Sequence, residues 1–190
     1  MCIRDRAYTR AYTTEVVQGK HGVKIVSHAS VVAETVQKIL DVTITWKIDA
    51  SGKIDADIEA TKDGEFPDLP RFGVRMFLDK KLSDARYFGM GPQESYRDKH
   101  QAASHGLYRA NVRDLHEDYI RPQENGSHYD CEYVELNNSR YGIVASAEKA
   151  FSFNASYYTQ EELEKKTHNY ELIESDSVVF CVDYALNGIG

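Results

Sequence analysis

The sequence predicts an all-β fold, an antiparallel β-sandwich with one short helix near residues 160–168. Apolar residues alternate with polar ones over residues 42–48 and again over 54–60, and a turn containing Gly52 separates the two runs. Thirteen tyrosines and only four prolines also favour strands. A helix signal appears where Thr159 is followed three residues later by Glu162, which is the pattern of a capping box.

The remaining elements follow from weaker alternation or from short apolar runs. Residues 89–92, Gly-Met-Gly-Pro, are predicted to form a loop, because two glycines and a proline do not suit a central strand. Residues 93–125 are predicted to form a long irregular loop that ends in a turn. Trp46 is expected in the core. Further strands are expected at 13–17, 24–28, 30–35, 72–78, 132–136, 141–145, 150–155 and 177–183.

Charge and composition exclude several classes of protein. The chain has 190 residues and a formal net charge of −7, which argues against a general nucleic-acid binder. No apolar run approaches the roughly 20 residues of a membrane-spanning helix. The three cysteines lie far apart in sequence, and Cys131 and Cys181 are expected to be buried, unreactive thiols. This composition fits a reduced, cytoplasmic protein.

Motifs for catalysis or metal binding do not appear. His100, His105 and His116 lack the spacing of a helical metal-binding pair, so we expect them to be solvated or hydrogen-bonded loop residues. Neither a Gly-x-Ser-x-Gly elbow nor a phosphate-binding glycine loop occurs. Thirty acidic residues allow many carboxylate pairs, and only geometry could identify a catalytic one. We therefore expect no catalytic residue and no metal site in this chain.

Aromatic residues surround the predicted long loop. Aromatic faces pack against sugar rings, and nearby carboxylates and amides bind sugar hydroxyls. The same side chains could instead pack the loop onto the sandwich, and both interpretations stay open. The residues are Tyr87, Phe88, Tyr96, Tyr108, Tyr119, Tyr129 and Tyr133.

The segment FGMGPQESYRD at residues 88–98 resembles the Gly-x-Gly-Pro-x-Glu-x-Tyr-x-Asp loop of family 2 β-galactosidases. That loop belongs to their C-terminal β-sandwich, which is called the small chain when it is encoded separately. The resemblance covers about residues 7–190. Other segments agree with the family in the same order, at residues 48–52, 69–73, 119–126, 135–137, 151–154, 158–163 and 187–190.

The resemblance implies a galactose-mutarotase-like supersandwich that packs on a catalytic barrel and supplies part of the active-site rim. It assigns a mobile loop near the aglycone to Gly91, Pro92, Gln93 and Glu94, with Tyr96 as support. Gly91 would supply the hinge. Ser95 and Arg97 replace residues more usual in the family, which leaves the aglycone preference open.

The resemblance also implies what the complete protein would contain. It would be a retaining β-galactosidase for lactose-type substrates and a homo-oligomer. Its two catalytic glutamates, its magnesium ligands and its main sodium ligands would lie on the barrel, outside this chain. The partner of this chain would be the rest of the β-galactosidase or a separate large subunit, with no role for nucleic acid or membrane.

The ends of the chain suggest a fragment. Residues 1–6 are expected to be a leader foreign to the fold, and residues 7–190 an incomplete sandwich that ends shortly before the family's substrate-stacking tryptophan. Unpaired edge strands and exposed apolar faces would then make the isolated chain aggregate. Two alternatives remain: a stand-alone carbohydrate-binding module, or an aldose-1-epimerase-like enzyme that uses His168 and Glu94.

Overall fold

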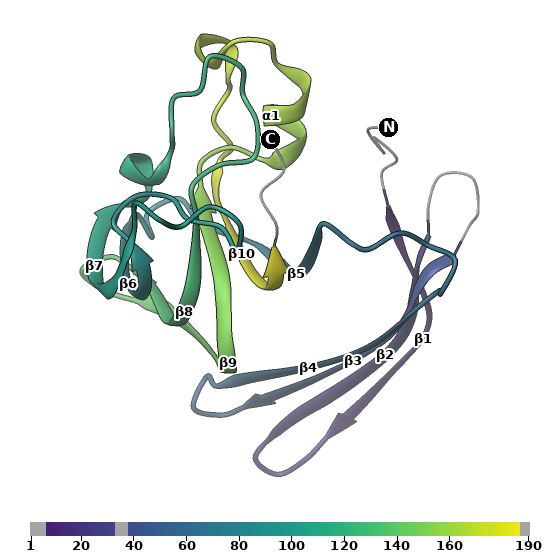
Figure 1. Ribbon diagram of the computed structural model, residues 1–190. Coiled ribbons are helices and arrows are strands. Elements are labelled where there is room, and N and C mark those ends of the chain that lie inside the picture. Colours follow the sequence, from purple (N-terminus) through teal and green to yellow (C-terminus); the bar gives the residue numbers. More distant parts are fainter. Residues whose placement is uncertain (1–6, 33–37, 187–190) are drawn as a thin grey trace. The chain divides into compact units, whose positions relative to one another are not determined.

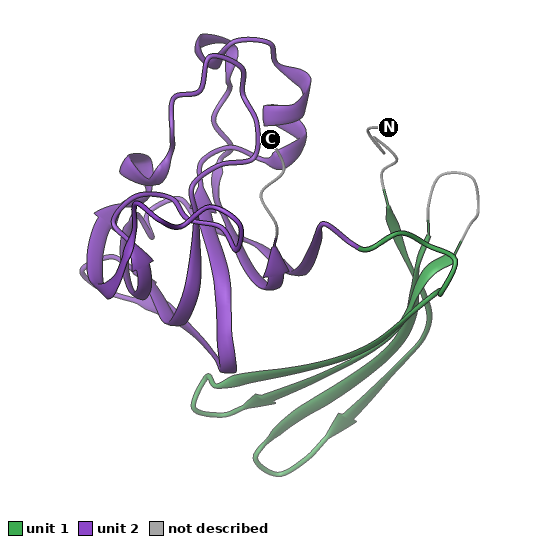
Figure 2. Cartoon of the chain, viewed as in Figure 1, with its two compact units in different colours: residues 1–68 green, residues 69–190 purple. Residues whose placement is uncertain are grey.

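The computed structural model describes residues 7–32 and 38–186, and within them the chain divides into two compact units (Figure 2). Unit 1 comprises residues 1–68 and unit 2 comprises residues 69–190. Each unit contains one antiparallel sheet. No helix among the described residues is long and apolar enough to cross a membrane. The predicted all-β class is therefore confirmed, and both antiparallel sheets that a sandwich needs are present.

Unit 1 is a four-stranded meander in which each strand pairs with the next along the chain (Figure 1). The predicted hairpin at 42–60 is confirmed, and Gly52 supplies its turn with φ of +89°. Oδ1 of Asp49 accepts hydrogen bonds from the backbone N–H groups of Ser51 and Lys53, at 2.8 and 3.1 Å. The strands are β1 (Tyr8–Gln18), β2 (Gly22–Val32), β3 (Lys38–Asp49) and β4 (Ile54–Lys62).

Two predictions for unit 1 need correction. The strands expected at 24–28 and 30–35 form one continuous strand, β2, and the last three residues of that range lie outside the described residues. Trp46, expected in the core, is only half-buried on β3. Its partner across the β2–β3 pair is Ile25, which is also half-buried.

Unit 2 is a six-stranded antiparallel sheet with the order β5-β10-β9-β8-β6-β7. Its core contains fully buried side chains from four neighbouring strands, among them Tyr87, Val134, Phe153 and Phe180. Burial of such large side chains is the main source of stability in a sheet of this size. The strands are β5 (Arg71–Asp79), β6 (Asp84–Gly91), β7 (Ser104–Asn111), β8 (Ser127–Asn137), β9 (Gly142–Ser156) and β10 (Ser177–Leu186).

The loops predicted at 89–92 and 93–125 are wrong in part. Gly89 and Gly91 lie inside β6, which is flanked by β8 and β7. A Cβ atom on Gly89 would lie 2.3 Å from Sγ of Cys131, so glycine allows β6 to pack closely against β8. Only Pro92 follows the strand. The predicted long loop contains β7 and the 3₁₀ helix η1 (Val112–Leu115).

Strand β9 joins two segments that were predicted to be separate strands. Tyr133 pairs with Ser146 and Cys131 pairs with Phe151, so residues 147–150 of β9 bulge out of the β8–β9 register. The predicted thiol burial is confirmed for Cys131 and Cys181. Burial raises the pKa of Cys131 to about 12, which keeps this thiol protonated and unreactive.

The predicted short helix is confirmed as α1 (Gln160–Lys165). Oγ1 of Thr159 accepts a hydrogen bond from the backbone N–H of Glu162 at 3.1 Å, as expected of the N-cap residue. The carboxylate of Glu162 instead accepts a hydrogen bond from the N–H of Ile173, at 3.0 Å. The helix ends earlier than predicted, and a second 3₁₀ helix, η2 (Asn169–Glu171), follows it.

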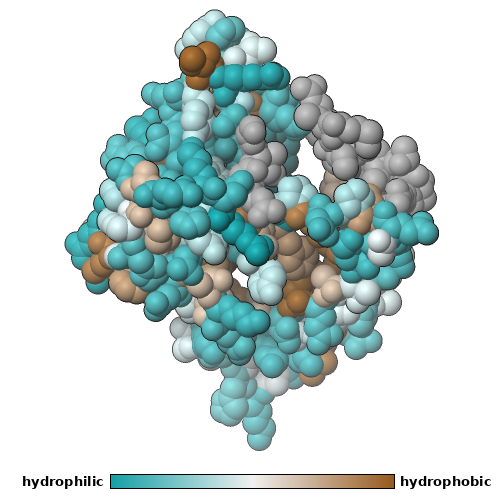
Figure 3. Space-filling model, viewed as in Figure 1, coloured by the Kyte–Doolittle hydropathy of each residue, from teal (hydrophilic) through white to brown (hydrophobic). Residues whose placement is uncertain are grey.

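Exposed apolar side chains lie on strands at the edges of both sheets. Val16 and Val17 on β1 are 63% and 60% exposed, and Phe77 on β5 is 56% exposed. On the face viewed in Figure 3, hydrophilic residues predominate. The expected exposure of apolar side chains is thus present, and aggregation of the isolated chain stays a prediction.

Candidate functional site

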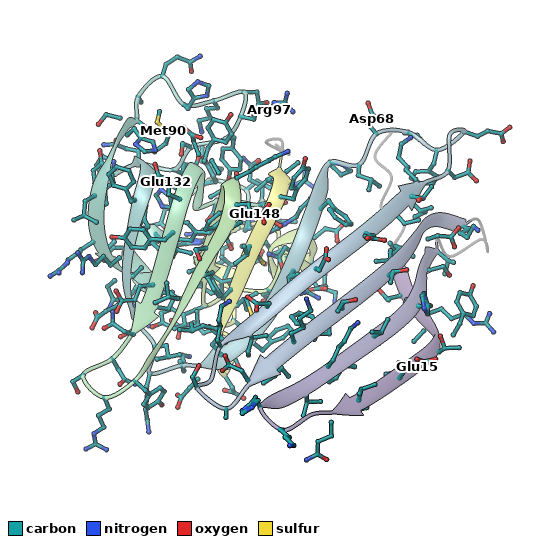
Figure 4. The ribbon with its side chains drawn as sticks, turned by 90° about the horizontal axis from the view of Figure 1, so that it is seen from below. Glu15, Asp68, Met90, Arg97, Glu132 and Glu148 are labelled. Carbon is teal, nitrogen blue, oxygen red and sulfur yellow. The ribbon has the colours of Figure 1, made fainter. Side chains whose placement is uncertain are left out.

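The segment at residues 92–99 leaves β6 and is fixed to the start of β8. The backbone N–H of Ser95 donates to the carbonyl oxygen of Ser127 at 2.7 Å, and Oγ of Ser95 accepts from the N–H of Tyr129 at 2.9 Å. Met90 and Arg97, before and within this segment, lie at the same end of the six-stranded sheet (Figure 4). We call residues 92–99 the Glu94 loop and residues 116–126, which precede β8, the facing loop.

Glu94 joins these two loops. Its side chain is only 6% exposed, and four donors surround its carboxylate. Oε1 accepts from Nζ of Lys99 at 2.7 Å and from the hydroxyl of Tyr119. Oε2 accepts from the backbone N–H of Gly126 at 3.0 Å and from the hydroxyl of Tyr96 at 3.2 Å. Both carboxylate oxygens are therefore engaged within the chain.

These contacts set the ionisation of Glu94. Burial alone would raise the pKa of this carboxyl group, but the hydrogen bonds from Lys99, Tyr119 and Gly126 outweigh burial and lower the pKa below its usual range. Glu94 is thus a carboxylate at neutral pH. A general acid needs a raised pKa, so this environment suits a structural anchor and not a proton donor.

Tyr96 extends the connection to the facing loop. Its side chain is 4% exposed, and its hydroxyl hydrogen is shared between Oε2 of Glu94 and the carbonyl oxygen of Glu124, at 3.2 and 3.3 Å. Its backbone pairs with that of Lys99 in both directions, at 2.7 and 3.1 Å. Burial raises the pKa of Tyr96, so the hydroxyl remains a donor.

A buried ion-pair cluster lies next to the facing loop. Nε and Nη2 of Arg71 on β5 donate to the two carboxylate oxygens of Asp183 on β10, at 2.8 and 2.7 Å. Nη1 of Arg71 donates to the carboxylate of Glu124. Burial raises the pKa of Asp183, and the hydrogen bonds from Arg71 partly offset this effect. A Cβ atom on Gly73 would lie 2.3 Å from Oδ1 of Asp183, so this glycine leaves room for the carboxylate.

The structure brings some of the predicted site residues together. Glu94 and Tyr96 are in contact; Tyr96 is buried and Glu94 is half-buried as a residue, whereas Pro92 and Gln93 are exposed at the start of the loop. Gly91 is buried at the end of β6, where a Cβ atom would lie 2.4 Å from the hydroxyl oxygen of Tyr87. Close packing is therefore a sufficient reason for glycine at this position, and the hinge role stays a prediction.

Sequence reasoning assigned no role to the Arg71 cluster. Arg71 and Glu124 lie in segments quoted for the family resemblance, but their contact joins residues 53 positions apart. Asp183 offered a signal that could have been used, because it directly follows the apolar run 178–182. A carboxylate in a buried strand requires a cationic partner.

The histidines have separate partners. Nδ1 of His100 contacts the carbonyl oxygen of Tyr96 at 3.1 Å, and Nε2 of His105, which lies in β7 and not in a loop, contacts that of Asp130 at 3.0 Å. Nε2 of His116 contacts Oδ1 of Asn169 at 3.2 Å. Across residues 7–32 and 38–186, no three His, Cys, Asp or Glu side chains are grouped so that they could hold a metal ion.

The pair suggested for an epimerase-like site is also divided between two clusters. His168 is half-exposed, with Nδ1 3.0 Å from the hydroxyl of Thr167 and its ring stacked on Tyr170. Glu94 is bound by the donors described above. Of the aromatic residues around the loop, Tyr87 and Tyr96 are buried and serve packing.

Comparisons with known proteins agree on one family. Residues 4–190 match the family described as "Beta galactosidase small chain". The chain is 46% identical over 186 residues to a β-galactosidase of Actinobacillus pleuropneumoniae and 32% identical over 182 residues to one of Staphylococcus xylosus. These alignments cover 98% and 96% of this chain but 18% of each relative. The chain thus spans less than a fifth of the length of these relatives.

Proposed function

Because this chain belongs to the β-galactosidase small chain family, we propose that it is one domain of a retaining β-galactosidase that hydrolyses terminal β-galactosides such as lactose. The near-complete match of the chain to this family is the observation that carries the proposal. The partner of the domain is the remainder of that enzyme, either in the same chain or as a large subunit.

Within that enzyme, the Glu94 loop forms part of the rim of the sugar-binding site. The engagement of Glu94 by four donors supports this role, because a rim must hold a fixed shape to orient a substrate. Pro92 and Gln93 are exposed at the start of the loop and are free to meet the aglycone. Glu94 and Tyr96 form the base that holds them.

The catalytic carboxylates and the bound metal ions belong to the rest of the enzyme. Retaining hydrolysis requires one carboxylate as nucleophile and another as acid and base. Glu94 does not suit either role, since its oxygens are occupied and its pKa is lowered. The magnesium and sodium ions implied by the family are likewise held outside this chain.

A hybrid enzyme tests the rim role. The matching segment of the Actinobacillus pleuropneumoniae β-galactosidase is replaced by this chain, and kcat/KM is measured for lactose and for β-galactosyl fluoride, which has no sugar aglycone. Glu94→Gln should lower the ratio of the lactose value to the fluoride value on the order of tenfold, because a misplaced loop affects mainly the aglycone. Glu148→Gln, a change at an exposed position on β9, is the matched control and should leave the ratio unchanged.

Two results would count against this function. An unchanged ratio in Glu94→Gln would remove the rim role. Calorimetric titration of the purified chain with galactose and lactose distinguishes a stand-alone carbohydrate-binding module from a domain that needs the rest of the enzyme. Millimolar or tighter binding by the chain alone would favour the stand-alone module.

A further inference from the structure

Arg71 contacts both Asp183 on β10 of the unit 2 sheet and Glu124 in the facing loop. We propose that Arg71 is a positioning residue for the Glu94 loop, acting through Glu124 and Tyr96. The coupling of Arg71 to the loop involves only residues of this chain. Its effect on sugar hydrolysis rests on the proposed function.

The first step of the coupling is the ion pair between Arg71 and Glu124. The side chains of Arg71 and Glu124 are 18% and 14% exposed, and that of Asp183 is 2% exposed. Nε and Nη2 are used on Asp183, which leaves Nη1 directed at Glu124. A planar guanidinium group can hold two carboxylates in fixed directions, whereas a lysine ammonium group acts as a point charge.

The second step leads from Glu124 to Glu94 by two short routes. The carbonyl oxygen of Glu124 accepts from the hydroxyl of Tyr96 at 3.3 Å, and the same hydroxyl contacts Glu94 at 3.2 Å. Gly126, two residues after Glu124, donates its N–H to Glu94 at 3.0 Å. A shift of the facing loop would therefore move the N–H of Gly126, which donates to Glu94. It would also move the carbonyl oxygen of Glu124, which holds the hydroxyl of Tyr96 next to Glu94.

The cost of burying this cluster supports a positioning role. Removing charged groups from water is costly, and well-packed apolar residues of similar volume often stabilise a core at least equally. The β5–β10 pair also contains the apolar residues Val74, Met76, Val178 and Phe180, so apolar packing already joins these two strands beside the ions. What the charged groups add is a hydrogen bond of fixed direction from Arg71 on the sheet to Glu124 in the facing loop.

Hydrogen–deuterium exchange in the hybrid enzyme tests the coupling directly. Arg71→Met and the milder Glu124→Gln, which keeps the backbone carbonyl and the side-chain volume, should raise exchange in residues 92–99 and 119–126 roughly tenfold, whereas β8 stays protected. Arg71→Lys should rescue this loosening only in part. Arg75→Met, on the same strand but paired with Glu161 at a half-exposed position, should change neither segment.

Kinetics of the same variants separate the outcomes. Arg71→Lys should raise KM for lactose more than KM for β-galactosyl fluoride, whereas a loss of folded enzyme would lower kcat for both substrates equally. Unchanged exchange of both segments in Arg71→Met and Glu124→Gln would overturn the positioning role. Increased exchange with an unchanged substrate ratio, in these variants and in Glu94→Gln, would leave the coupling intact and remove the rim function instead.

Discussion

Arg71 and Asp183 join β5 to β10 by two hydrogen bonds of 2.8 and 2.7 Å, between residues 112 positions apart in the sequence. Asp183 is 1% exposed, so its charge depends on Arg71 for compensation. Arg71 is the first residue of β5, and Asp183 lies three residues before the end of β10. Arg71 also contacts Glu124 in the facing loop. It therefore links the sheet of unit 2 to the candidate site.

Removing Asp183 should destabilise the chain strongly. Asp183→Ala leaves the guanidinium group of Arg71 buried with one partner fewer, and breaking a buried pair costs about 3–5 kcal/mol. Chemical denaturation of the variant should show this loss in the free energy of unfolding. Asp57→Ala, at an exposed position on β4, is the control and should change it by less than about 0.5 kcal/mol.

Gly126→Ala should disturb the facing loop. Gly126 has φ of +68°, and an added Cβ atom would lie 2.3 Å from the carbonyl oxygen of Leu115. The backbone strain alone costs about 1–3 kcal/mol, and the contact adds to it. Gly52→Ala separates the two effects, because Gly52 has φ of +89° with open space around it. A thermal melt should show a larger loss for Gly126→Ala, and equal losses would contradict the packing argument.

Phe153→Ala should remove a central part of the core of unit 2. Phe153 is fully buried and contacts the ring of Tyr87 edge-on, with the ring centroids 4.9 Å apart. Truncation of such a side chain costs about 3–5 kcal/mol in unfolding free energy. Phe77→Ala removes the same atoms from a half-exposed position on β5 and should cost much less. Similar losses for the two variants would mean that the core lies elsewhere.

Glu94 should contribute a pH-dependent part of the stability. The pKa of Glu94 is lowered in the folded chain from an ordinary value of 4.5. Its stabilising effect is therefore fully present above about pH 4.5 and is lost as the pH falls through the lowered folded value. Denaturation curves between pH 7 and pH 3 should show a smaller acid-induced loss for Glu94→Gln than for the unchanged chain. Identical pH dependence would show that Glu94 is not held as a carboxylate.

Strands with regular alternation could be predicted from the sequence, including β5 with its Gly73, whereas the glycine-rich end of β6 could not. The hairpin of β3 and β4 combines alternation with a turn at Gly52, and both are local signals. Strand β6 was missed because Gly89 and Gly91 are usually breakers, whereas here they allow close contact with Cys131 and Tyr87. Strand β7 mixes polar and apolar residues without a clear period and is positioned by pairing with β6.

The candidate site also has a part that the sequence could predict and a part that it could not. Glu94 and Tyr96 are two residues apart, so a sequence motif could identify both. The contacts of Glu94 with Tyr119 and Gly126 join residues 25 and 32 positions apart, and they depend on how two loops meet. Pairings of this kind follow from the order of strands in the sheet, which a single sequence does not reveal.

Hydrolysis of a chromogenic β-galactoside by two purified proteins, the 190-residue chain and the hybrid enzyme that carries it, is the most direct test of the proposed function. The account predicts turnover by the hybrid and none above background by the chain, because the catalytic carboxylates belong to the rest of the enzyme. Turnover by the chain alone would contradict it, as would a folded hybrid without activity beside an active parent enzyme.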